Sequence, residues 1–188
     1  MKKTVITLLA VFVLGLSSIQ ANATTITLGF DDIGQGTISQ NYGGLDWDQR
    51  WNVWDSAFSS YYPPKSNPNV LYSHNASLVT KFGSNVTFLG SWIASVNAGQ
   101  SLWWEGYVNG VKIFESAHLA GGTTQFLSLN WAGVNEVRYV TSGTNQYSII
   151  DDFTYSTDGP SAPVPEPSTF ILLGIGIAGA VLVRRRKK

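Results

Sequence analysis

The sequence contains no cysteine and only two histidines among its 188 residues. Without cysteine there is no disulfide framework, no thiolate metal site and no cysteine nucleophile. The histidines, His74 and His118, have no metal-ligand spacing, and no serine lies in a nucleophile-elbow pattern. Stability must therefore come from an ordinary hydrophobic core, and nucleophilic catalysis has no support in the sequence.

Charge is also scarce, at 13% of residues, and the formal charges of the chain sum to zero. Within residues 24–160, five basic residues stand against eleven acidic ones, a formal charge of −6. Phosphate binding requires a basic surface, so an acidic domain is a poor partner for nucleic acid. We therefore expect no nucleic-acid partner, whereas divalent cations or neutral glycans fit this composition better.

The first 23 residues have the order of a secretory signal peptide. Two lysines precede an apolar run over residues 5–16, and small residues allow cleavage after Ala23. The alternative is an uncleaved membrane helix, which needs about 20 apolar residues, more than this run supplies. We expect a signal peptide at residues 1–23 and export through the inner membrane.

The middle of the chain, residues 24–158, has the pattern of an antiparallel all-β domain. Short runs rich in Val, Ile, Thr and aromatic residues are separated by Gly, Asn, Pro and Ser. No stretch outside the two terminal apolar runs has a helical period. Eight runs suit a two-sheet sandwich of the jelly-roll type. The predicted strands are residues 25–30, 77–82, 86–95, 101–108, 111–116, 124–130, 135–141 and 147–155.

Two local patterns are specific. Asn109-Gly110 can adopt the two positive φ angles of a type I′ turn, which predicts a hairpin between the flanking strands. In residues 136–139, alternation places Val137 and Tyr139 on one face and the charges of Glu136 and Arg138 on the other. This strand should have one solvent-facing side.

Two longer segments are less regular. Residues 86–96 are almost continuously apolar, so we expect a central strand that is covered on both faces. Residues 43–69 are aromatic but contain three prolines, which favours a long loop excursion with one or two short strands.

The C-terminal end has the features of a short membrane anchor. Residues 159–167 form a Pro-rich linker, and residues 168–188 contain an apolar run, 170–183, closed by Arg184, Arg185, Arg186 and two lysines. Basic residues directly after a membrane segment stay in the cytoplasm, so the domain should face outward. At about 1.5 Å per residue the run spans roughly 21 Å of a hydrocarbon core of about 30 Å. We expect a single, marginal transmembrane helix that suits temporary anchoring.

The order Val164-Pro165-Glu166-Pro167-Ser168, apolar run and basic end resembles the PEP-CTERM sorting signal. The resemblance implies that an exosortase, a transpeptidase-like membrane enzyme of certain Gram-negative bacteria, recognises Pro165, Glu166 and Pro167 and cleaves near them. The protein would then be anchored transiently in the inner membrane and released to the cell surface or the extracellular space. A plain tail-anchored protein is the alternative. The resemblance states where the protein goes and says nothing of what its domain does.

The ends of the domain resemble those of jelly-roll carbohydrate-binding modules. Gly29-Phe30-Asp31-Asp32 stands near its start and Ile149-Ile150-Asp151-Asp152-Phe153 near its end. The resemblance implies that the first and last strands lie together and that an acidic residue from each helps bind one structural Ca²⁺, here Asp31 with Asp151 or Asp152. Without a cation such carboxylates would repel one another. The alternative is that one aspartate of each pair faces solvent and the other caps a turn.

Alternation allows only one of the two late aspartates to face such a site. Within residues 147–155, Asp151 shares a face with Ile149 and Phe153, whereas Asp152 shares the other face with Ile150.

Five aromatic residues gather in the predicted loop excursion, Trp47, Trp51, Trp54, Tyr61 and Tyr62. Exposed, these rings could stack on sugar rings. The alternative is that they cover the end of a core that has no disulfides, because large aromatic side chains are also the main source of core energy.

Glu105 and Glu115 flank the predicted hairpin, but nothing in the sequence places them in a shared cleft. We expect solvent-facing strand residues and no enzyme. The sequence favours an exported cell-surface or matrix protein associated with exopolysaccharide, as in a biofilm. A lectin-like glycan-binding module is the alternative, and a glycan-active enzyme is a more distant one.

Overall fold

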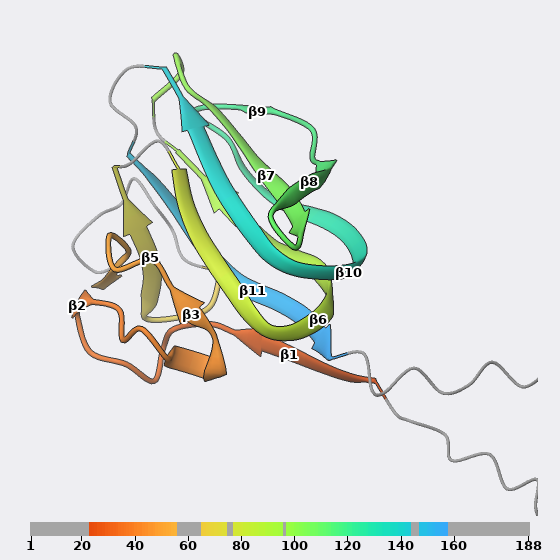
Figure 1. The fold of residues 1–188 in the computed structure, drawn as a ribbon. Coiled ribbons are helices and arrows are strands. Elements are labelled where there is room, and N and C mark those ends of the chain that lie inside the picture. The colour runs from red at the N-terminus through yellow and green to blue at the C-terminus, as the bar shows by residue number, and fades with distance from the viewer. Residues whose placement is uncertain (1–22, 56–64, 75–76, 96, 144–146, 158–188) are drawn as a thin grey trace, which may run out of the picture. The chain divides into compact units, whose positions relative to one another are not determined.

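Strands make up most of the part of the chain that the computed structural model describes, which is residues 23–55, 65–74, 77–95, 97–143 and 147–157 (Figure 1). Residues 1–22 of the predicted signal peptide, the linker and the sorting tail fall outside these ranges. Every strand pair is antiparallel, which confirms the all-β antiparallel class. In the described ranges no helix is long and apolar enough to cross a membrane. The elements are β1 (Thr24–Leu28), β2 (Gly36–Thr37), the 3₁₀ turn η1 (Tyr42–Gly44), β3 (Asp46–Trp47), β4 (Asn52–Asp55), β5 (Asn69–Ser73), β6 (Ser77–Ala94), β7 (Ser101–Val108), β8 (Val111–Glu115), β9 (Leu119–Ala120), β10 (Thr124–Ser142) and β11 (Ser148–Thr157).

Hydrogen bonds join these strands into one 11-stranded sheet, so the two layers of the expected sandwich are continuous halves of a single sheet. Its order is β2-β4-β5-β11-β6-β10-β7-β8, with β1 beside β11, β3 beside β6 and β9 beside β7. The long strands β6 and β10 cause this continuity. Residues 77–81 of β6 pair with the second half of β10 and with β3, whereas residues 86–94 pair with the first half of β10 and with β11. The sheet folds over on itself where β6 and β10 curve in Figure 1.

The sequence predicted strand breaks near residues 83–85 and 131–134, but the pairing continues through both. Residues 83–85 are exposed at the bend of β6. In β10 the register shifts between residues 128 and 136, where Asn130 has φ 53° and Gly133 has φ 78°. Bulges let a strand bend without ending it. The Gly and Asn residues that indicated turns therefore mark bends of longer strands.

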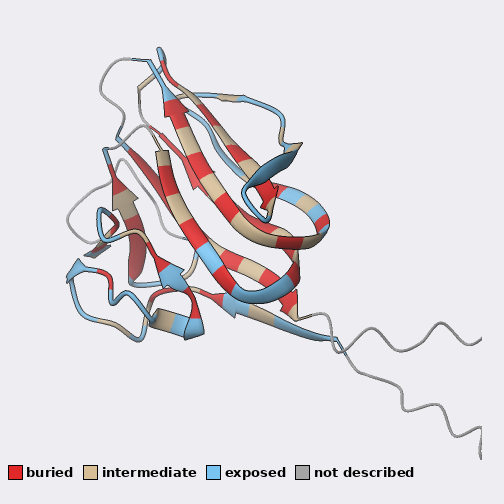
Figure 2. Ribbon diagram, in the orientation of Figure 1, coloured by how far each residue is buried: buried red, intermediate tan, exposed pale blue. Residues whose placement is uncertain are grey.

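An aromatic core fills the space between the two halves of the sheet. The ring of Phe153 lies at centroid distances of 5.1 Å from Trp47, 4.9 Å from Phe88 and 5.8 Å from Trp104. Figure 2 shows buried residues recurring along β6 and β10, with exposed residues at their bends. Burial of this apolar area is the main favourable contribution to folding.

Several local predictions are confirmed. Asn109 and Gly110 have φ angles of 50° and 80° and connect β7 to β8. Val137 and Tyr139 are buried, whereas Glu136 and Arg138 lie on the opposite face. β6 is central, between β11 and β10, and the described part of residues 43–69 contains the short strands β3 and β4.

The predicted alternation in β11 is wrong because the strand is bulged at Asp152. This residue has φ 46°, and the register with β6 shifts between Asp151 and Thr154. Ile150 and Phe153 therefore both belong to the main core. Ile149 lies in a separate small cluster, with Val70 and Ala94. An unbroken strand would have placed Phe153 on the side of Ile149, away from the core.

Candidate functional site

The first and last strands lie side by side, as the resemblance implied. β1 pairs with β11 over its whole length, with Leu28 opposite Phe153. Asp31 follows β1 and accepts a 2.8 Å hydrogen bond from the Asn69 N–H at Oδ1. Asp151 and Asp152 belong to β11, so the fold brings the three predicted aspartates to the same end of this pair of strands.

Asp151 is buried and its carboxylate is enclosed by donors. Its Oδ2 accepts the backbone N–H groups of Lys65 and Ser66 at 2.7 and 2.9 Å. Its Oδ1 accepts the Ser66 hydroxyl at 3.0 Å and the Asp152 N–H at 2.7 Å. Burial raises the pKa of Asp151, and these hydrogen bonds oppose the rise. Asp151 therefore ties residues 65–66 to β11, which is a structural role.

Asp31 and Asp152 are the pair on which a calcium site would depend. Burial raises the pKa of Asp152, and the nearby charge of Asp31 raises it further, against a hydrogen bond with Ser66. A cation between Asp31 and Asp152 would relieve this repulsion. Asp151 is less suited to bind a cation, because both of its carboxylate oxygens already accept hydrogen bonds. Within the described ranges no group of three or more His, Cys, Asp or Glu side chains is arranged to hold a metal. Calcium at Asp31 and Asp152 remains a prediction.

The three tryptophans proposed as sugar contacts occupy different environments. Trp47 and Trp51 are 2% and 0% exposed and belong to the core, where Trp51 lies 5.5 Å from the ring of Tyr139. Neither offers a ring face to a sugar, so the alternative of a core role holds for both. Trp54 is 41% exposed and remains a candidate. The two tyrosines of the predicted cluster, residues 61 and 62, lie outside the described ranges.

Trp54 begins a line of neighbouring rings that we call the aromatic row: Trp54, Tyr72, Tyr147 and His74. Their successive centroid distances are 5.1, 5.9 and 5.7 Å, and the rings of Tyr72 and Tyr147 are nearly parallel, at 13°. Tyr147 is 42% exposed. The row forms because β5 pairs with both β4 and β11.

The sequence did not single out Tyr72, Tyr147 or His74. Tyr72 and His74 are close in sequence, but both are distant in the chain from Trp54 and from Tyr147. Only the order of the strands brings the four rings together. Only the alternation in β4 could have indicated that Trp54 faces outward, because Val53 beside it is buried in the core while Trp54 is exposed on the other side of the strand.

Glu105 and Glu115 lie directly opposite each other on β7 and β8. Lys112 bridges them, with its Nζ 3.1 Å from Glu105 Oε1 and 2.6 Å from Glu115 Oε2. Burial would raise the pKa of Glu105, but hydrogen bonds from Tyr107, Lys112 and Trp103 outweigh it and lower that pKa. Hydrogen bonds from Lys112 and His118 lower the pKa of Glu115. The two carboxylates form a salt-bridge network with the lysine between them.

Comparison with curated protein sequences finds no match. Among solved structures, the N-terminal CBM22-1-CBM22-2 tandem domain from Paenibacillus barcinonensis Xyn10C is 11% identical with a TM-score of 0.44, over 79% of this chain and 49% of that chain. The cleaved adhesin domain of Lys-gingipain is 16% identical with a TM-score of 0.41, over 75% and 94%. CBM51 from Clostridium perfringens GH95, in complex with methyl-galactose, is 15% identical with a TM-score of 0.37, over 70% and 99%. That sugar is a ligand of the clostridial protein.

The sorting residues of the tail, Pro165, Glu166 and Pro167, and the basic stop, Arg184, Arg185 and Arg186, lie outside the described ranges. The identification of the tail therefore rests on sequence. Residues 163–187 match the model of the PEP-CTERM protein-sorting motif, which includes all six of these positions, so the chain carries a PEP-CTERM sorting signal at its C-terminal end.

Proposed function

We propose that this protein is a non-catalytic component of the cell surface or extracellular matrix and that its β domain holds polysaccharide through the aromatic row. The PEP-CTERM motif implies export, processing by an exosortase and targeting to the cell surface. Processing would release the domain from the inner membrane of a Gram-negative cell into a layer rich in exopolysaccharide. A protein retained in such a layer needs a surface that binds carbohydrate.

The observation that carries this proposal is the aromatic row. Trp side chains are highly buried on average and Tyr side chains are intermediate, because large rings supply much of the apolar area of a core. Trp54 and Tyr147 are instead 41% and 42% exposed. Tyr72 lies between them, at 5.1 and 5.9 Å from their centroids. A line of rings offers apolar faces to successive sugar units, while the phenol and imidazole groups of Tyr147 and His74 supply polar contacts.

The state of Glu105, Glu115 and Asp151 supports a non-catalytic role. Glycoside hydrolysis needs one carboxyl group whose raised pKa keeps it protonated as the acid, beside a second that stays ionised. The opposed pair Glu105 and Glu115 has both pKa values lowered. Asp151 has a raised pKa, but its two oxygens accept four hydrogen bonds from the protein.

The test of the row compares Trp54→Ala and Tyr147→Ala with Val111→Ala, which removes an exposed apolar side chain from β8. Full-length protein in mild detergent is run through native gels that contain neutral polysaccharides. We expect the two row variants to lose the retardation that wild type and the control show. Equal retardation of all four proteins contradicts a role of the row.

A lectin-like module that selects one sugar is the alternative, favoured by the polar groups of Tyr147 and His74 in the row. A glycan array separates the two functions. Binding to one oligosaccharide family would identify a lectin, and weak binding across many neutral polymers would fit general matrix retention.

The sorting step has its own test. Replacing Pro165, Glu166 and Pro167 by alanine should leave the protein exported but uncut, so that it accumulates in the inner membrane fraction. Ser161→Ala, which changes the same linker outside the motif, serves as the control and should be released like wild type. Normal release of the triple variant would show that exosortase does not use this motif.

A further inference from the structure

A cavity of about 270 Å³ opens between β3, β6 and β10. Its volume is just below the roughly 300 to 1,000 Å³ of pockets for drug-sized ligands. Five charged side chains line it, together with Trp47 and Val79. They are Asp46, Asp48, Lys81, Glu136 and Arg138.

Four of the charged groups around this cavity are fixed by interactions within the protein. Arg50 donates to Asp48 from Nε at 2.9 Å and from Nη2 at 2.5 Å, and its Nη2 also donates to the Ser77 carbonyl at 2.7 Å. The hydrogen bonds from Arg50 to Asp48 lower the pKa of Asp48. Arg138 donates from Nε to Glu136 at 2.6 Å and lies 4.0 Å above the ring of Tyr107. Side chains that are already ordered lose little entropy when a ligand binds.

Among the residues that the structure describes, Lys81 has no such partner. The register places it opposite Asp46 on β3 and Glu136 on β10. Within the described part of the chain it makes no salt bridge, and its side chain is exposed. Its ammonium group therefore offers three donors to a bound molecule, next to carboxylate oxygens that accept.

The balance of charge indicates the class of ligand. With Arg50, the cavity region has three carboxylates and three cations, so a ligand with a net charge would meet groups of both signs. A hydroxyl group donates to a carboxylate and accepts from an ammonium or guanidinium group equally well. A neutral, hydroxyl-rich molecule can satisfy both, and the volume limits it to a small unit such as part of an oligosaccharide.

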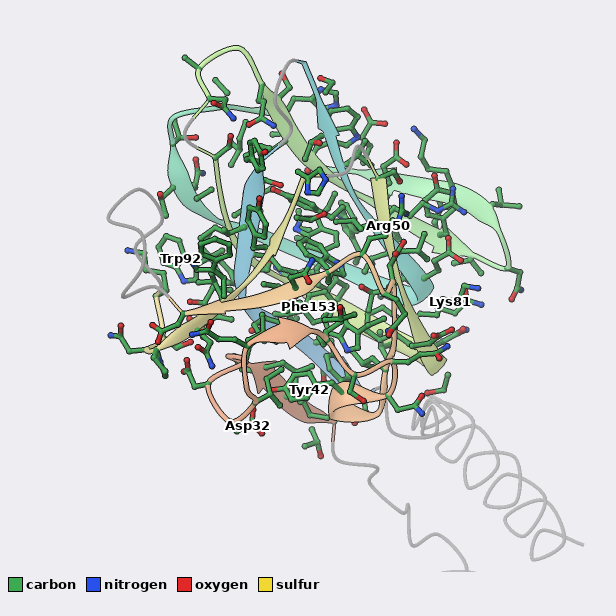
Figure 3. The ribbon with its side chains drawn as sticks, turned by 90° about the vertical axis from the view of Figure 1, so that its left-hand side faces the viewer. Asp32, Tyr42, Arg50, Lys81, Trp92 and Phe153 are labelled. Carbon is green, nitrogen blue, oxygen red and sulfur yellow. The ribbon has the colours of Figure 1, made fainter. Side chains whose placement is uncertain are left out.

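The cavity and the aromatic row belong to different strands: β3, β6 and β10 line the cavity, whereas Trp54 and Tyr72 belong to β4 and β5. Figure 3 shows Phe153 between Trp92 on one side and Arg50 and Lys81 on the other. Trp92 lies two residues before Ala94, which clusters with Tyr72 of the row. One domain thus carries two separate candidate surfaces.

We propose that this cavity is a second site, specific for neutral saccharides, and that the domain thereby bridges two polysaccharide chains. The bridging part rests on the proposed function, because it requires that the aromatic row bind carbohydrate as well. A bivalent domain would cross-link the matrix that retains it, and linked sites increase overall avidity without any new contact.

The test measures stoichiometry with full-length protein in mild detergent and a panel of neutral gluco-, galacto-, manno- and xylo-oligosaccharides, with uronic-acid oligomers for comparison. Wild type should bind two oligosaccharides per chain, and should make solutions of the matching polymer turbid. Lys81→Ala and Glu136→Gln should each lower the stoichiometry to one and abolish turbidity, while Trp54→Ala should remove the other site. Lys112→Ala, which makes the same charge change on β8 outside the cavity, should behave as wild type.

The outcomes separate the two proposals. A stoichiometry of one that is lost in Trp54→Ala and unchanged in the two cavity variants overturns the second site and leaves the proposed function intact. Binding that is lost in the cavity variants alone supports the cavity and contradicts the row. Preference for uronic-acid oligomers overturns the assignment to neutral saccharides, and no binding by wild type overturns both proposals. Near-UV circular dichroism confirms that each variant is folded.

Discussion

Replacing Trp51 by alanine tests whether the tryptophans of the predicted cluster divide into core and surface. Trp51 is fully buried and its ring lies 5.5 Å from that of Tyr139. Truncation of a buried Trp costs about 3 to 5 kcal/mol, since transfer energy is lost and a cavity remains. Domains are stable by only about 5 to 15 kcal/mol, so this is a large fraction of the total.

Two further variants refine this prediction. The Trp51 Nε1 atom is buried and has no hydrogen-bond partner in the described part of the chain. Trp51→Phe removes this unpaired N–H, whose burial costs about 1 to 3 kcal/mol, together with part of the ring volume. We expect it to cost less than half as much as Trp51→Ala. Trp54→Ala, at a side chain that is 41% exposed, should cost about 1 kcal/mol or less.

Thermal unfolding of full-length protein in mild detergent, followed by near-UV circular dichroism, provides the measurement. For a domain of this size each kcal/mol shifts Tm by roughly 3 to 4 °C, so Trp51→Ala should lower Tm by about 10 to 20 °C. Trp54→Ala should stay within about 4 °C of wild type. Equal melting temperatures for the two alanine variants would refute the division into core and surface.

Three other predictions concern the carboxylates. Asp151→Asn should lower the free energy of unfolding, measured by chemical denaturation, by about 2 to 4 kcal/mol, because the new amide N–H₂ cannot accept hydrogen bonds from the donors that surround this position. This loss is expected although the substitution removes a buried charge. Unchanged stability would contradict the structural role of Asp151. The pKa of Glu105 is lowered in the folded state. Its contribution to stability is therefore present above the unfolded pKa of about 4.3 and is lost as the pH falls through the folded pKa. In melting curves recorded between pH 6 and pH 3, Glu105→Gln should lose less stability than wild type. Calcium bound between Asp31 and Asp152 should add about 2.7 kcal/mol at about 100 times its dissociation constant, and melting curves that are the same in chelator and in millimolar calcium would exclude the site.

The sequence alone determined the features that depend on neighbouring residues. The sorting signal is a linear pattern of a short motif, an apolar run and a basic end, so no folding is needed to recognise it. Asn109-Gly110 specified its hairpin because Asn and Gly adopt positive φ angles at low cost. Alternation likewise assigned Glu136 and Arg138 to the outside of a strand whose other face is buried.

Only the tertiary structure decided which distant segments meet. The aromatic row requires β5 to lie between β4 and β11. The cavity requires β3 to pair with the start of β6. Neither pairing leaves a periodic signal in the sequence. The bulge at Asp152 changed which face Phe153 occupies, since one extra residue reverses the alternation after it. Trp51 and Trp54 are only three residues apart, but Trp51, which precedes β4, is buried in the core, whereas Trp54 within β4 is 41% exposed.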